Sequence, residues 1–313
     1  MVYIIINIIL LVGGFIVLIK GADMFVDGAS NVAKNFKVSK MLIGLTIVAF
    51  GTSAPEFAVS VKGLLSGSFV IGSNILNILL ILGASALIHP LIVKNDTVKK
   101  ELPITLLITT LFAVLLLDNV FDRHMINNFT RGDGIVLILF FLVFIYYLIT
   151  LMRNKVEDEK EEEVWKLSKS ILFTVLGLVM IIVGSDFVVE SASSLAKEIG
   201  ISERIISLTI IALGTSLPEL VTSIMATKKG EYDIAIGNVV GSNIFNIGIV
   251  MGLPVTILGG ITKIAFSYID LIVMIGAALL LFIFSRNDYK IKKSEGIAFL
   301  IIFVIYYSYV ILG

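Results

Sequence analysis

The sequence predicts an all-α integral membrane protein whose ten transmembrane helices form two inverted five-helix repeats. Three observations support this fold class: the composition, the number of long apolar segments, and a repeated motif. Of the 313 residues, 58% are hydrophobic and only 15% are charged, and the mean hydropathy is +1.04. Because soluble domains carry about 25% charged residues, this composition is typical of a membrane protein.

Ten segments approach or exceed the roughly 20 apolar residues that a helix needs to cross a bilayer. They cover residues 3–30, 41–64, 69–88, 102–117, 134–152, 168–192, 204–226, 234–257, 267–285 and 295–311. The first lacks the leading positive charge of a cleavable signal peptide, so we expect it to be retained. We expect a first repeat at 1–152, a cytoplasmic linker at 153–167 and a second repeat at 168–313.

The positive charges predict the orientation of these spans. Odd-numbered connections hold 17 Lys and Arg residues and even-numbered ones hold six. Since Lys and Arg gather on the cytoplasmic side, we expect the N- and C-termini outside and a multi-pass location in the plasma membrane. Basic and acidic residues balance at 24 each, which gives no reason to expect a nucleic-acid partner, and the absence of cysteine excludes disulfides and thiolate metal sites.

Two stretches of the chain repeat each other. Residues 21–61 and 184–224 align at a constant offset of 163, with 19 of 41 positions identical. Five spans separate the copies, so they must cross in opposite directions, which predicts an inverted repeat about an axis in the membrane plane. The most similar part reads Gly-Thr-Ser-x-Pro-Glu at residues 51–56 and again at 214–219.

This first motif predicts a broken helix that ends in an acid. Pro55 and Pro218 have no amide hydrogen, and the Gly, Thr and Ser before them weaken the same turn. A carboxylate at this depth is costly, so we expect Glu56 and Glu219 to meet at the middle of the membrane and bind cations together. Two hydroxyl side chains precede each acid by three and four residues, on the same helical face. They are Thr52, Ser53, Thr215 and Ser216.

A second motif, Gly-Ser-Asn-Ile-x-Asn, occurs at residues 72–77 and 241–246. Its serine and last asparagine are four residues apart and share one helical face. These residues are Ser73, Asn77, Ser242 and Asn246. Together the two motifs offer carboxylate, amide, hydroxyl and backbone oxygens, a set that suits calcium, which takes 6–8 oxygen ligands in flexible geometry. Such a set suits sodium as well.

Other polar residues in the spans have a structural explanation. We expect close packing or interhelical hydrogen bonds at a first group. It contains Thr46, Thr209, Ser60, Ser223, Asn74 and Asn243. A second group lies late in the two longest helices, where caps or ion pairs are expected and a role in the ion pathway is the alternative. It contains Asp23, Asp27, Asp186 and Glu190. Asp270 is expected near the start of the ninth span.

The two repeats differ in length between their motifs. They align at an offset of 163 up to Gly67 and at an offset of 169 from Gly72 onward. The first repeat therefore lacks six residues, including any counterpart of Gly237 and Asn238. Six helical residues span about 9 Å, so the second motif of the first repeat is expected nearer the membrane surface unless a neighbouring segment compensates.

The doubled motifs in inverted halves resemble those of the sodium/calcium exchangers of the cation/calcium antiporter superfamily, and the resemblance covers the whole chain. It implies an ion site made from the second, third, seventh and eighth helices, with Glu56 and Glu219 as the central acids. It also implies first and sixth helices that slide across the core. The further ligands that it implies are backbone oxygens of Ala49, Thr52, Ala212 and Thr215, hydroxyls of Ser53, Ser73, Ser216 and Ser242, and the amides of Asn77 and Asn246.

One departure from the family pattern bears on which ions the protein is expected to transport. Some family members carry an aspartate at one of the positions of Asn77 and Asn246, whereas this chain has amides at both. The site then has two full negative charges, enough to neutralise one calcium ion. Potassium co-transport, which the family associates with the extra acid, is therefore not expected.

The resemblance implies a secondary active antiporter that exchanges Ca²⁺ for Na⁺ by alternating access, with the ions bound at the midplane. The expected partners are the lipid bilayer and these two ions; we expect no cofactor and no obligate protein partner. A proton/calcium exchanger that uses the same two acids is the alternative, and a passive cation channel is a remote one. An enzyme is not expected, since nothing in the motifs supplies an oriented nucleophile for acid–base hydrolysis.

Overall fold

The computed structural model describes residues 2–59, 67–121, 128–153, 164–262 and 266–312. The first half contains α1 (Val2–Phe36), α2 (Lys40–Ile43), η1 (Gly44–Val48), α3 (Ala49–Thr52), α4 (Ala54–Val59), α5 (Gly67–Leu76), η3 (Asn77–Leu82), α6 (Gly83–Ile88), β1 (Leu91–Ile92), η4 (Thr97–Glu101), α7 (Leu102–Leu115), α8 (Asp118–Phe121), β2 (Asn128–Thr130) and α9 (Arg131–Arg153). The second half contains α10 (Leu167–Glu198), α11 (Glu203–Ile206), η5 (Ser207–Ile211), α12 (Ala212–Thr215), α13 (Leu217–Lys228), α14 (Tyr232–Phe245), η6 (Asn246–Met251), α15 (Gly252–Leu258), β3 (Gly260–Thr262), α16 (Tyr268–Arg286), β4 (Lys290–Ile291) and α17 (Lys293–Leu312). The elements labelled η are π-helical.

Helix occupies all ten segments in which the sequence predicts a span. In the described part of the chain, seven helices are long and apolar enough to cross a membrane, and the bent pair Thr209–Thr215 and Leu217–Lys228 makes up to eight. The second predicted span, 41–64, ends outside the described residues. The described residues therefore form a membrane protein built mainly of helices, with four strands of only two or three residues each.

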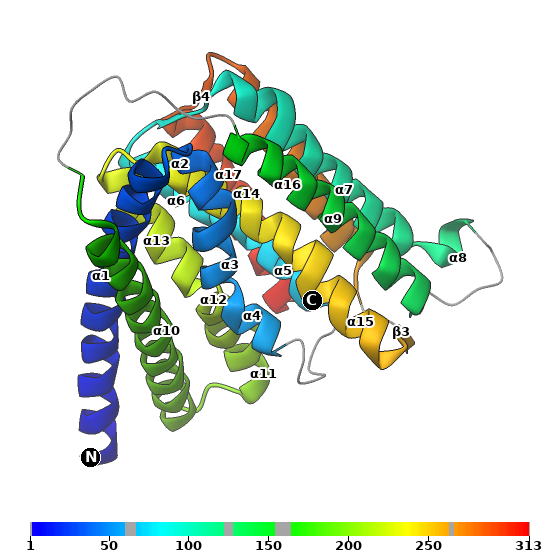
Figure 1. The fold of residues 1–313 in the computed structure, drawn as a ribbon. Coiled ribbons are helices and arrows are strands. Elements are labelled where there is room, and N and C mark those ends of the chain that lie inside the picture. The colour runs from blue at the N-terminus through cyan, green and yellow to red at the C-terminus, as the bar shows by residue number, and fades with distance from the viewer. Residues whose placement is uncertain (1, 60–66, 122–127, 154–163, 263–265, 313) are drawn as a thin grey trace.

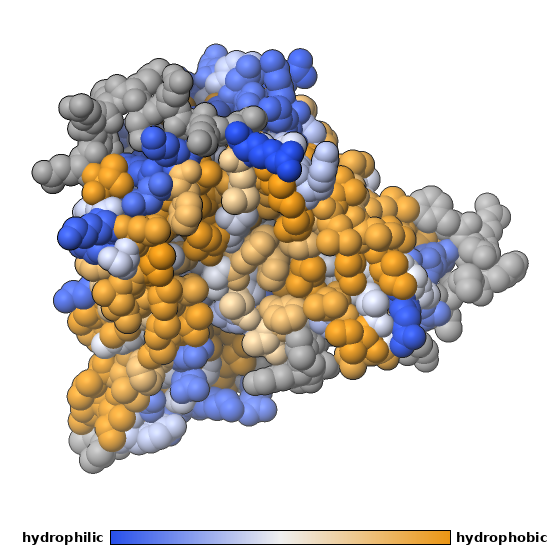
Figure 2. Space-filling view, viewed as in Figure 1, coloured by the Kyte–Doolittle hydropathy of each residue, from blue (hydrophilic) through white to orange (hydrophobic). Residues whose placement is uncertain are grey.

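The helices form an inner and an outer group (Figure 1). The apolar window of Tyr232–Leu258 is 89% buried and that of Phe69–Ile88 is 72% buried, whereas the figures for α1 and α17 are 22% and 17%. The outer helices expose apolar side chains, and Figure 2 shows these as a broad hydrophobic band with hydrophilic residues gathered toward its ends. Such a band is the surface that a bilayer requires.

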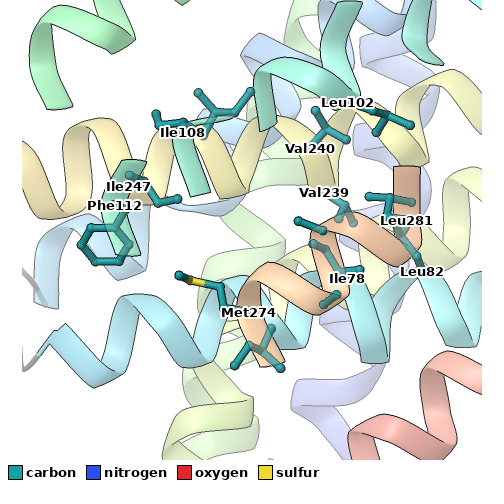
Figure 3. Packing of buried hydrophobic residues seen from close by; sticks show 14 of the residues in the cluster. Ile78, Leu82, Leu102, Ile108, Phe112, Val239, Val240, Ile247, Met274 and Leu281 are labelled. Atoms are coloured by element: carbon teal, nitrogen blue, oxygen red, sulfur yellow. The ribbon is translucent and has the colours of Figure 1, made fainter. Parts of the chain in front are cut away.

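The apolar core joins inner helices from both halves. Ile78 of η3 and Phe112 of α7 lie close to Val239 of α14, Ile247 of η6 and Met274 of α16 (Figure 3). All five side chains are at most 1% exposed. Because these side chains interdigitate, the core fixes α5, η3, α14 and η6 relative to one another.

The two longest helices, α1 and α10, lie side by side and run antiparallel. Glycines seven residues apart make the contact. A Cβ added at Gly21 would lie 2.7 Å from the Met180 Cβ, and one added at Gly177 would lie 2.5 Å from the backbone nitrogen of Phe25. Only glycine therefore allows the two backbones to approach this closely.

Short strands link the two halves of the chain at two places. β1 pairs antiparallel with β4, and β2 pairs antiparallel with β3. The sequence does not predict these strands, because two or three residues are too few for a strand pattern. They give hydrogen-bond partners to the backbone where helices end. At one such end Ser267 and Asp270 form a capping box that starts α16, which confirms the expected position of Asp270.

Irregular backbone recurs at matching positions of the two halves. The π-helical stretches η1 and η5 differ by the offset of 163, and η3 and η6 differ by the offset of 169. π-Helical turns are rare and are frequent at functional sites. They flank both motifs in each half, so they direct attention to the helices that carry Glu56 and Glu219.

Candidate ion-binding site

The predicted helix breaks are present at equivalent serines. Ser53 ends α3 with φ −85° and ψ 7°, and Ser216 ends α12 with φ −93° and ψ 7°. Pro55 and Pro218 lie in the first turns of the helices that follow, where a missing amide hydrogen costs nothing. The bend across the second break is 54°. Both motifs therefore interrupt their helices where the sequence predicts.

Both acids are buried at the start of a helix. Glu56 is 1% exposed and Glu219 is 0% exposed. Each lies in the first turn of its helix, α4 or α13, where the helix dipole favours a negative charge. Two buried carboxylates remain costly without a compensating cation. A cation bound by the two carboxylates would offset this cost.

Ser53 connects the first break to the acid of the second half. Its hydroxyl donates to Glu219 Oε1 at 2.9 Å, and its Oγ lies 2.9 Å from Ser242 Oγ. Ser242 Oγ is in turn 3.4 Å from the carbonyl oxygen of Ala49. Four of the predicted ligands, from three helical segments, thus form one group of oxygens.

Asn238 is a member of this group that the sequence analysis missed. Its amide nitrogen donates to the backbone oxygen of Glu219 at 3.2 Å and to Ser223 Oγ at 2.9 Å. Its amide oxygen lies 3.0 Å from the Thr52 hydroxyl, which donates to it. Asn238 precedes Ser242 by four residues, so the i, i+4 spacing used for Ser242 and Asn246 could have found it.

Asparagines form a second group where the third and eighth helical regions meet. Asn77 Nδ2 donates to Asn243 Oδ1 at 2.9 Å, and Asn243 Nδ2 donates to the backbone oxygen of Asn74 at 3.3 Å. All three are 1% exposed. The interhelical hydrogen bonds expected of Asn243 are therefore present beside the predicted ligand Asn77, whereas both side-chain amide atoms of Asn74 have no partner within the described residues.

The missing six residues do not expose the second motif of the first half. Ser73 is 3% exposed and Asn77 is 1% exposed. In spite of the missing residues, Asn77 keeps its contact with Asn243.

Several buried polar atoms of these residues have no hydrogen-bond partner within the described chain. Buried polar atoms normally have one, so these atoms are available to a ligand. They include Glu56 Oε2, Glu219 Oε2, Asn77 Oδ1, Ser216 Oγ and both amide atoms of Asn246. No group of three or more His, Asp or Glu in the described residues could hold a metal ion. The donor set is thus two carboxylates with neutral oxygens, which suits calcium or sodium.

Thr215, another predicted ligand, is not hydrogen-bonded to this group of oxygens in the described part of the chain. The Thr215 hydroxyl donates to the backbone oxygen of Ala212 at 3.1 Å, within its own turn. Thr46 and Thr209, expected to be structural, likewise donate to carbonyls of their own helices at 2.6 Å each. Ser60, in the same expectation, lies outside the described residues.

Ion pairs hold α1 to the loop between α13 and α14. Lys229 Nζ lies 2.7 Å from Asp23 Oδ1 and 2.5 Å from Asp27 Oδ1. Glu231 accepts from Ser30 and Lys40, both at 2.8 Å. The ion pairs expected of Asp23 and Asp27 are therefore confirmed. Their counterparts on α10, Asp186 and Glu190, are exposed.

Comparison with known proteins places this geometry in context. Residues 6–150 and 169–312 match the family described as sodium/calcium exchanger protein. A putative antiporter, CaxA of Alkalimonas amylolytica, is 37% identical, with 94% of this chain and 95% of the relative covered. Sodium/calcium exchanger MaX1 of Methanosarcina acetivorans is 32% identical, with 96% of this chain and 97% of the relative covered.

A solved structure resembles the whole chain. The structure of the sodium-calcium exchanger NCX_Mj soaked with 10 mM Na⁺ and zero Ca²⁺ superposes with a TM-score of 0.82 at 32% identity. The match covers 96% of this chain and 98% of that one.

Proposed function

Because this chain belongs to the sodium/calcium exchanger protein family, we propose that it is a secondary active antiporter that exchanges Ca²⁺ for Na⁺ across the membrane. One observation carries the proposal. Two buried acids, Glu56 and Glu219, lie at equivalent helix breaks, and Ser53 of the first break donates to Glu219 beside the second. This arrangement stabilises a cation that has left water.

The two carboxylates explain why the ions compete. Together they neutralise one Ca²⁺ or more than one Na⁺, but binding both kinds at once would leave an excess of buried positive charge. Neutral oxygens complete the coordination of either ion. The set that we propose is Thr52, Ser53, Ser73, Asn77, Thr215, Ser216, Ser242 and Asn246, with the backbone oxygens of Ala49 and Ala212.

We propose alternating access by movement of the outer pair α1 and α10 across the inner helices. Their little-buried faces and small-residue contact support this assignment. We further infer ten spans in two inverted repeats, 1–152 and 168–313, joined by a linker at 153–167. The matching π-helical stretches and the paired strands that link the halves support this inference. Both termini would lie outside the plasma membrane.

Sodium is the counter-ion that we favour over protons. The relatives whose names state a counter-ion for calcium name sodium. A proton would neutralise Glu56 and Glu219 without needing the neutral oxygens around them. No cofactor and no protein partner enter the proposed cycle, which needs only the two ions and the bilayer.

The proposal is tested by calcium-45 uptake into proteoliposomes loaded with sodium, with Glu56→Gln and Glu219→Gln measured alongside. We expect uptake that requires the outward sodium gradient and falls to background in both variants. Uptake driven by a pH gradient without sodium would favour proton exchange, and calcium flux without any counter-ion would favour a channel. Full exchange by either variant would overturn the assignment of the acids.

A further inference from the structure

We propose that Asn238 is a positioning residue that holds Thr52 and Glu219 together, and that only one half of the site has such a residue. The inference rests on the proposed function, because it assigns a role within the same ion site. Asn238 is not itself proposed as an ion ligand.

The hydrogen bonds of Asn238 use its whole amide. Its two N–H groups serve the Glu219 backbone oxygen at 3.2 Å and Ser223 Oγ at 2.9 Å, and its oxygen accepts from Thr52 at 3.0 Å. Asn238 is 0% exposed, as are Thr52 and Ser223. A buried amide with all of these bonds made has one stable orientation. It therefore joins α3, α13 and α14 at a single point.

This point lies between two proposed ligands. Ser53, the residue after Thr52, donates to Glu219 Oε1 at 2.9 Å. A hydroxyl that donates its hydrogen to a fixed amide keeps its lone pairs for a cation. The bond from Asn238 to the Glu219 backbone fixes the turn that carries the carboxylate. Asn238 thus fixes the positions of the Thr52 hydroxyl and the Glu219 carboxylate before an ion binds, which lowers the entropic cost of ion binding.

The first half has no equivalent amide. The residue four positions before Ser73 in α5 is Phe69, a partly buried side chain that packs against the apolar core. Both threonines can donate within their own turn, Thr52 to Ala49 at 3.3 Å and Thr215 to Ala212 at 3.1 Å, but among the described residues only Thr52 also bonds to an amide of another helix. The six-residue difference between the repeats therefore removes this positioning residue from the Glu56 half.

Close packing accompanies the amide in the second half only. A Cβ added at Gly241 would lie 2.6 Å from the Ala49 Cβ, whereas one added at its counterpart Gly72 would meet nothing within 4 Å. α14 is thus pressed against the first broken helix at the level of Asn238. The same contact is absent for α5 at Gly72.

The test measures calcium-45 binding to the purified full chain in detergent without sodium. Asn238→Leu keeps the volume of the side chain and removes its hydrogen bonds. We expect Kd for calcium to rise about ten-fold, equivalent to ~1.4 kcal/mol. The matched control, Phe69→Leu, changes the equivalent helical position and should leave Kd within about two-fold of the unmutated protein.

A double-mutant cycle separates positioning from a general structural role. Asn238→Leu and Thr52→Val each remove the same hydrogen bond, so their effects on Kd should be clearly less than additive, a result that general destabilisation would not give. Asn238→Ser makes the same test if the leucine variant does not fold. Unchanged Kd in the Asn238 variants, additive effects, or an equal loss in Phe69→Leu would overturn the inference.

The binding assay also keeps the two proposals distinguishable. If the unmutated protein binds calcium in the expected Asn238-dependent way but shows no sodium-driven uptake, the exchange function fails and the positioning role stands. If uptake is sodium-driven but binding does not depend on Asn238, the positioning role fails and the exchange function stands.

Discussion

Ser53 and Ser216 occupy equivalent helix breaks, yet their surroundings differ. Ser53 bonds to Glu219 and lies against Ser242, whereas the Ser216 hydroxyl has no partner within the described chain. The helical segments that precede the two breaks also differ in how far their side chains are buried. Leu42 and Val48 are 3% and 0% exposed, whereas their counterparts Ile205 and Ile211 are 41% and 43% exposed. At these two positions the first broken helix is buried and the second is exposed, although Ile47 of the first is itself 39% exposed.

This difference bears on the alternating access that we propose. Two identical motifs in inverted halves would be equivalent only if the molecule were symmetric. A protein that opens to one side at a time must instead pack the two halves differently in each state. The following predictions compare equivalent substitutions in the two halves, and they test whether the difference in packing also produces a difference in ion binding, stability or transport.

The largest effect is expected from removing the two serine hydroxyls in turn. Ser53→Ala removes a hydrogen bond to a carboxylate, an interaction that contributes about 1.5–3 kcal/mol. We expect calcium to bind about ten-fold more weakly or worse, whereas Ser216→Ala should weaken binding by less than about three-fold. Equilibrium binding of calcium-45 measures both. Equal losses of calcium affinity in the two variants would show that both serines contribute equally to binding although they are packed differently.

A smaller effect is expected from adding one methyl group to each half. Gly241→Ala places a Cβ 2.6 Å from the Ala49 Cβ, whereas Gly72→Ala places one in open space. Overpacking of this kind costs about 1–3 kcal/mol, so Gly241→Ala should lower the unfolding temperature and Gly72→Ala should leave it nearly unchanged. Thermal unfolding followed by tryptophan fluorescence or calorimetry provides the comparison. A stable Gly241→Ala with full transport would contradict the close contact.

The smallest effect is expected from the charges at the ends of α1 and α10. Lys229→Gln breaks two ion pairs that are partly exposed and contribute up to about 1 kcal/mol each. We expect α1 to be held less firmly to the α13–α14 loop, where the Ser30–Glu231 hydrogen bond remains, so that transport kinetics change by about two- to five-fold. Asp186→Asn, at the counterpart of Asp23, should change them less. Because the chain has no cysteine, a single Met24→Cys reports the looser contact as faster thiol labelling, and unchanged labelling would count against it.

The sequence predicts the helix breaks and the burial of both acids well, because their causes are local. Pro55 and Pro218 interrupt a helix in any surroundings, and the apolar segments around Glu56 and Glu219 place both acids inside the protein. The helical regions follow from apolar length alone. These features need no knowledge of which helices touch.

The positions of Asn238, Asn243 and Ser223 depend instead on contacts between distant segments. Asn238 has no repeated partner, so a search for symmetric residues passes over it. Asn243 and Ser223 read as packing residues, and only the crossing of α14 with its neighbours brings them to Asn77 and Asn238. The strands β1 to β4 were missed for the same reason, since each depends on a partner about 130 to 200 residues away.

The glycine contact between α1 and α10 has a mechanical consequence. At Gly21 and Gly177 the two backbones approach so closely that little side chain lies between the helices. Shear between the two helices would drive side-chain atoms into the facing main chain. We therefore expect α1 and α10 to move as one rigid pair, so that a displacement at one end of the pair is transmitted to the other end.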